Sequence, residues 1–94
     1  MLESEYEKIK ENWQEVKERL CTEFDLDDNF DTLIEPLQVC DYYGNTVTII
    51  YTRKGHDVNR IVRYVYMNYG SFIEQTIEEL TGIHCDIVIT YEKS

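Results

Sequence analysis

Apolar residues recur at intervals of three and four along the first quarter of the chain, which is the spacing of one face of an α-helix. Ser4 and Glu7 have the spacing of a capping box, so we expect the helix to begin there. Charged residues, including Lys17, fill the other face. The pattern predicts a long amphipathic helix whose apolar stripe is Tyr6, Ile9, Trp13, Val16 and Leu20, extended by Phe24.

Between this helix and the middle of the chain, the sequence predicts a short helix and a β-hairpin. The acidic stretch 25–29 offers N-cap residues for a helix through Ile34, and Pro36 disfavours helical backbone at Glu35. Residues 37–42 and 46–51 have strand character, and the Tyr43-Gly44-Asn45 stretch between them is a tight-turn signal.

A second long helical pattern and an alternating segment complete the chain. The helix is expected after Asp57, with apolar residues to Leu80 and Gly82 as its C-terminal cap. Gly70 lies inside this helix and indicates a bend or close packing. The final strand is expected at residues 83–91, with its odd-numbered residues on the inner face.

The order ααββαβ predicts an α+β fold in which residues 1–94 form one domain. We expect a three-stranded antiparallel sheet with the helices packed on one face. In a split β-α-β arrangement the last strand would lie beside the first.

The composition limits the classes of function. The net charge is −10, with 19 acidic and 9 basic residues, which argues against nucleic-acid binding and favours basic partners. The chain lacks an apolar run long enough for a membrane span, and its first residues are acidic. We therefore expect a cytoplasmic protein that does not associate with a membrane. Three widely spaced cysteines are typical of reduced thiols and not of a metal site.

The sequence carries no pattern that predicts an enzyme. Adjacent residues of a strand point to opposite faces, so His84 and Cys85 are badly placed to act together. No Ser-His-Asp signature and no glycine-rich phosphate loop is present. We expect no catalysis and no cofactor.

An ordered set of landmarks from Trp13 to Tyr91 resembles the N-terminal domain (domain I) of the bacterial replication initiator DnaA. The matching stretches are residues 13–20, Phe30, 33–37, 44–49 and 77–82. The resemblance implies a fold related to the type II KH domain, here without its G-x-x-G loop. The chain departs from the family at residues 52–57, where a Pro-Asn step and an aromatic residue are usual, and at Leu33, where tryptophan is common.

The resemblance also implies partners and residues. Trp13, with Ile9 on the same helix, would mediate self-association as a weak homodimer, and Asp28 or Asn29 would contact the replicative helicase. The chain would act in replication initiation through self-association and recruitment of helicase or regulator proteins. Two alternatives stay open: a KH-like nucleic-acid-binding module, and a free-standing domain that inhibits initiator oligomerisation.

Three groups of residues have more than one reading. Trp13 can be a core residue or an interface residue. The acidic run 23–31 can be a solvated loop or a docking surface. A basic cluster can bind phosphates, or pair with the acidic first helix or with a second copy; it consists of Arg53, Lys54, Arg60 and Arg63.

Overall fold

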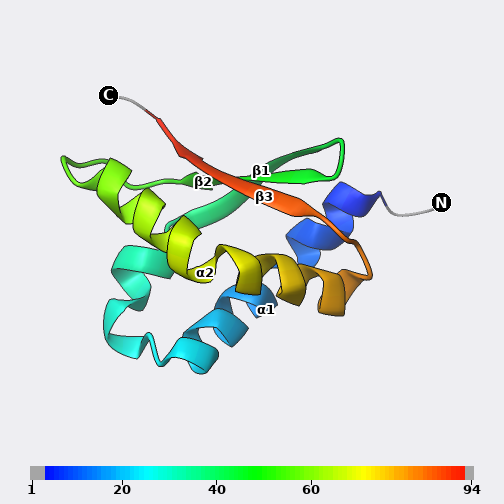
Figure 1. Cartoon of the computed structure of the whole chain (residues 1–94), viewed down its shortest axis with the longest axis horizontal. Helices are drawn as coiled ribbons and strands as arrows, with labels where there is room; N and C mark the ends of the chain where they lie inside the picture. The colour runs from blue at the N-terminus through cyan, green and yellow to red at the C-terminus, as the bar shows by residue number, and fades with distance from the viewer. Residues whose placement is uncertain (1–3, 93–94) are drawn as a thin grey trace.

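The computed structural model describes residues 4–92, and its first element is the predicted long helix (Figure 1). Helix α1 spans Glu5–Phe24. The Ser4 N-cap is confirmed, because its side chain accepts a hydrogen bond of 3.1 Å from the Glu7 backbone N–H. The Glu7 carboxylate accepts from the Ser4 hydroxyl at 3.3 Å. The helix ends at Asp25, whose backbone is left-handed at φ 54°.

The predicted short second helix is not an α-helix. A 3₁₀ turn spans Asp27–Asn29 and a π-helical turn spans Phe30–Ile34, and neither has a side-chain cap. The turn ends at Ile34 as expected, yet Glu35 keeps a right-handed helical backbone despite Pro36. The reason is that the Glu35 N–H closes the π turn by donating to the Phe30 carbonyl at 2.8 Å.

The predicted hairpin is present. Strands β1, Leu37–Tyr43, and β2, Thr46–Tyr51, pair antiparallel. Gly44 and Asn45 connect them, with φ of 55° and 68°. Positive φ at both central residues is what a tight turn of matching twist requires. A bulge between Val39 and Asp41 interrupts β1.

The neighbour of the last strand is the main correction to the predicted topology. Strand β3 spans Asp86–Tyr91 and pairs parallel with β2, so the order is β1-β2-β3 and the sheet is mixed. Strand β2 is the better central strand, since it is unbroken, whereas β1 follows Pro36 and contains the bulge. The β2-α2-β3 segment is therefore a parallel crossover unit.

Helix α2 connects β2 to β3 and spans Val58–Thr81. Gly82 ends it at φ 76°, as predicted, while Asp57 makes no side-chain cap. The close packing expected at Gly70 is not found, because a Cβ there would lie 3.8 Å from Ile87 Cδ1, which is an ordinary van der Waals distance. Strand β3 begins three residues later than predicted, but its inner face is correct, and Ile87 is buried.

Both long helices cover the same face of the sheet, as expected (Figure 1). The core lies between the two layers and includes side chains from α1, the sheet and α2. One prediction fails here: Lys17 is buried and not on a solvated face. Over the described residues, neither long helix has the length of apolar sequence needed to cross a bilayer.

Candidate interaction surfaces

Trp13 and Ile9, the two residues assigned to self-association by resemblance, are core residues in the monomer. Trp13 is 5% exposed and Ile9 is 1% exposed. The indole Nε1–H of Trp13 donates to the Leu37 carbonyl at 2.8 Å and so ties α1 to the start of β1. A role in self-association stays a prediction for both, and their burial argues against direct contact with a second copy.

Lys17 lies one helical turn after Trp13 and reaches the same backbone segment. Its Nζ donates to the Glu35 carbonyl at 3.1 Å and to the Leu37 carbonyl at 3.4 Å. The Glu35 carboxylate is 3.8 Å away and largely exposed. Burial lowers the pKa of Lys17, and the charge of Glu35 partly opposes this effect. The Lys17 side chain therefore holds the turn before β1 through these hydrogen bonds and is not free to bind a partner.

Asp28 and Asn29, the residues assigned to helicase contact by resemblance, are exposed in the 3₁₀ turn. Their neighbour Asp27 accepts a hydrogen bond of 3.3 Å from the Cys21 thiol. Burial, followed by this bond, raises the pKa of Cys21. The turn thus offers acidic side chains to solvent at one end of α1, and their contact with a partner stays a prediction.

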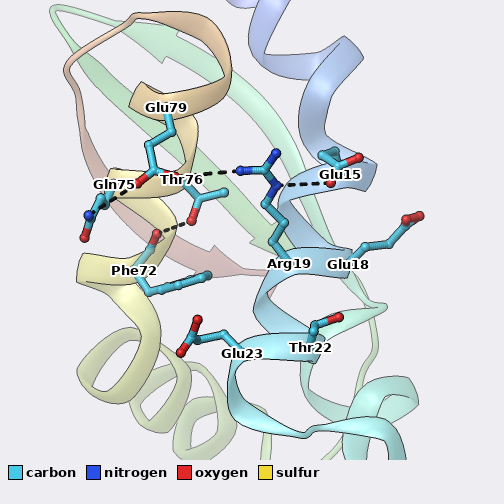
Figure 2. A pocket seen from close by; sticks show the side chains of 9 residues that line it. All are labelled: Glu15, Glu18, Arg19, Thr22, Glu23, Phe72, Gln75, Thr76 and Glu79. Carbon is cyan, nitrogen blue, oxygen red and sulfur yellow. Dashed lines mark hydrogen bonds and ion pairs between the residues drawn. The ribbon is translucent and has the colours of Figure 1, made fainter.

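A groove of about 470 Å³ runs between α1 and α2, and sequence reasoning did not identify it (Figure 2). The Phe72 side chain projects from α2 into this groove. Its lining is Glu15, Glu18, Arg19, Thr22 and Glu23 from α1, and Phe72, Gln75, Thr76 and Glu79 from α2. Four carboxylates and one guanidinium give the groove a net charge of −3.

Arg19 is the only cation of the groove, and it is already engaged by both helices. Its Nε lies 3.1 Å from Glu15 Oε2, and its Nη1 lies 3.7 Å from Glu79 Oε2 (Figure 2). Glu18 and Glu23 form no ion pair or hydrogen bond within the described part of the chain. These two carboxylates are available to a positively charged partner.

The sequence indicated the residues that α1 contributes to this groove but not those that α2 contributes. Glu15 and Arg19 have the i, i+4 spacing of a helical ion pair. Nothing in the sequence placed Glu79 or Phe72 beside them, because that depends on how the two helices pack.

The basic cluster does not pair with α1. Within residues 4–92, none of its four side chains forms an ion pair. Arg53 donates from Nη1 to the Asp31 carbonyl at 3.2 Å. Arg53 and Lys54 lie in the loop before α2, and Arg60 and Arg63 are exposed on α2. Pairing with a second copy stays a prediction.

His84 and Cys85 lie before β3 and not within the predicted strand, yet their side chains are separated by burial. His84 is exposed, and its Nδ1 lies 2.7 Å from Glu78 Oε1; this hydrogen bond raises the pKa of His84. Cys85 is buried, which raises the pKa of its thiol to about 11. In the part of the chain that the structure describes, no three His, Cys, Asp or Glu side chains are grouped to hold a metal ion.

Comparison with known proteins does not place the chain in a family. No protein-family model matches the sequence, and no curated protein matches it. The resemblance to DnaA domain I therefore rests on the landmark residues alone.

Proposed function

We propose that the chain is a protein-interaction module that docks a basic segment of a partner protein in the groove between α1 and α2. The observation that carries the proposal is the unengaged carboxylate of Glu23, which lies beside the Phe72 side chain (Figure 2). A second unengaged carboxylate, that of Glu18, lies on the α1 rim of the groove and points away from Phe72. A lysine or arginine of the partner would meet the carboxylates, and an apolar residue would pack on the aromatic ring. Interfaces commonly combine a buried aromatic with surrounding polar contacts.

Charge would act mainly on the rate of association. A net charge of −10 creates a long-range attraction for a basic partner, and this attraction weakens as salt screens it. Exposed ion pairs contribute little to affinity, typically about 0.2–1 kcal/mol each, so packing on Phe72 would contribute the rest.

The resemblance to DnaA domain I supplies the biological setting of the proposal. The module would act in replication initiation, through self-association and through recruitment of the replicative helicase or of regulator proteins. Asp28 and Asn29 belong to a second acidic surface, which the resemblance assigns to the helicase.

The test is binding of the purified replicative helicase and initiator from the source organism, measured by calorimetry and by stopped-flow association. We expect Glu18→Lys combined with Glu23→Lys to slow association at least about tenfold at low salt. Glu92→Lys combined with Asp86→Lys is the control of equal charge change, since both residues are exposed and lie outside the groove.

Two outcomes would redirect the proposal. If Asp28→Lys blocks helicase binding and the groove variant does not, the 3₁₀ turn is the docking surface. If the wild-type chain binds neither helicase nor initiator but binds single-stranded RNA or DNA through the basic cluster, the nucleic-acid alternative is correct and the interaction module is wrong.

A further inference from the structure

The outward face of α2 carries charges of opposite sign at its two ends. Residues spaced by three or four lie on one stripe of a helix. The outer stripe of α2 consists of Arg60, Arg63, Met67, Ser71, Glu74 and Glu78. Its first two members are basic, its last two are acidic, and the middle two are uncharged. All are exposed except Glu74, which is half-buried.

The middle of this stripe carries the exposed Met67, and two exposed tyrosines of α2 lie beside the stripe on opposite sides of it. Six large apolar residues are exposed in residues 4–92, and three of them are Tyr64, Tyr66 and Met67. Met67 is 75% exposed and each tyrosine is 48% exposed. Tyr64 contacts the Tyr69 ring edge-on with centroids 5.9 Å apart, and Tyr66 lies against Gly70, so both rings are anchored to the monomer.

The charge pattern is symmetric about the centre of the helix. Arg60 and Glu78 are equidistant from residue 69, and Arg63 and Glu74 are nearly so. With a rise of about 1.5 Å per residue, the outer pair spans about 27 Å and the inner pair about 16 Å. A second α2 laid antiparallel across this face would bring each basic end against an acidic end.

We propose that a second copy of this chain docks on the outer stripe, with the two α2 helices antiparallel about a two-fold axis near residue 69. Each Arg60 would face the Glu78 of the other copy, and each Met67 would face the small Ser71. A two-fold contact uses the same surface on both copies, so the surface has to be self-complementary, as this one is. The inference deepens the self-association within the proposed function and does not use the groove.

The pairing also accounts for the absence of partners around the basic residues. Arg60 and Arg63 have no ion pair within residues 4–92. Glu74 and Glu78 are only partly engaged: Glu74 Oε2 accepts from the Ile87 backbone N–H at 3.0 Å, and Glu78 Oε1 faces His84. In both cases the second carboxylate oxygen has no partner there.

The dimer is expected to be weak. Two copies that each carry a net charge of −10 repel one another at long range. A contact made by one helix pair would be smaller than a standard interface, and transient complexes commonly bury less than about 1,200 Å². The exposed ion pairs would set the antiparallel orientation, while Met67, flanked by Tyr64, would supply the apolar contact.

The test is a charge exchange at the outer pair, followed by sedimentation over a concentration series. Arg60→Glu and Glu78→Lys are both exposed substitutions, and circular dichroism checks that each variant is folded. We expect the wild-type chain to dimerise and each variant alone to raise the dimer dissociation constant about tenfold or more. An equimolar mixture of the two variants should form a heterodimer, because both outer pairs are then attractive.

Met67→Asp tests the apolar contact independently of the charge pairs, and we expect this variant to be monomeric. A wild-type chain that stays monomeric at millimolar concentration overturns the inference. So does a dimer that survives Arg60→Glu, or a variant mixture that stays monomeric. Failure here is distinguishable from failure of the groove: Arg60→Glu should keep partner binding, and the Glu18 and Glu23 variant should keep the dimer.

Discussion

At the scale of single residues, the hydrogen bond between the Trp13 indole and the Leu37 carbonyl links α1 to the first strand. We expect Trp13→Phe to lower the free energy of unfolding by about 1–3 kcal/mol, because a buried acceptor loses its best donor and some packing volume. Urea unfolding followed by circular dichroism measures this loss. An unchanged free energy of unfolding would show that the bond contributes nothing.

The same variant separates the two readings of Trp13. If its role is confined to the core, Trp13→Phe leaves the dimer dissociation constant unchanged when measured well below the unfolding transition. A large change in that constant with a small change in stability would support the interface reading instead.

The sequence predicted the apolar stripe that contains Trp13 but placed Lys17 wrongly. Lys17 follows Val16 and lies one turn from Trp13, so it borders the stripe. A charged residue at such a border is normally solvated. It is buried here because the chain turns at residues 35–37 and presents two carbonyls to its ammonium group. That turn is distant in sequence, so no local pattern revealed it.

At the scale of elements, Gly70 lies in the middle of α2 with ordinary helical backbone and space for a methyl group. A Cβ there would meet Ile87 Cδ1 and Tyr66 Cδ1 at 3.8 Å, which is normal contact. We expect Gly70→Ala to stabilise the protein by about 0.5–1 kcal/mol, because alanine favours the helix. For a domain of this size, thermal unfolding should shift upward by about 2–8 °C.

Gly82 is the matched control for this substitution. Its φ of 76° lies in the left-handed region, which alanine adopts only with strain. We expect Gly82→Ala to destabilise the protein by about 1 kcal/mol. If both substitutions shifted the transition in the same direction, helix propensity and backbone strain would not explain the two glycines.

The elements themselves were largely predictable, and their neighbours were not. Local spacing and turn residues identified both long helices, the hairpin and the inner face of β3. The pairing of β3 with β2 depends on which strand the crossover returns to, and sequence spacing does not record that choice. The bulge that weakens β1 as a central strand has no clear sequence signal either, since Cys40 is an unremarkable strand residue.

At the scale of the whole molecule, the two surfaces differ in how far the sequence could reveal them. The outer stripe of α2 follows from one helical pattern, so the order of its charges is visible once the helix is assigned. The groove combines residues from two helices more than 50 positions apart, such as Arg19 and Glu79, and needs the packed structure. Surfaces made by one element are therefore more predictable than surfaces shared by two.

The excess of acidic over basic residues lowers the stability of the folded protein through charge repulsion. Nineteen carboxylates compete for nine lysines and arginines. In residues 4–92, only Lys17 and Arg19 form lysine or arginine ion pairs. Repulsion among the unpaired carboxylates therefore opposes the folded state, and few attractive pairs offset it.

We expect added salt to stabilise the protein for this reason. Raising sodium chloride from about 10 mM to about 150 mM shortens the screening length from about 30 Å to about 8 Å, which weakens the repulsion. The midpoint of thermal unfolding should rise, at neutral pH and at concentrations too low for the dimer. The effect should shrink near the isoelectric point of about 4.5, where the net charge vanishes. A midpoint that falls with salt at neutral pH would mean that the two ion-paired cations contribute more than the repulsion does.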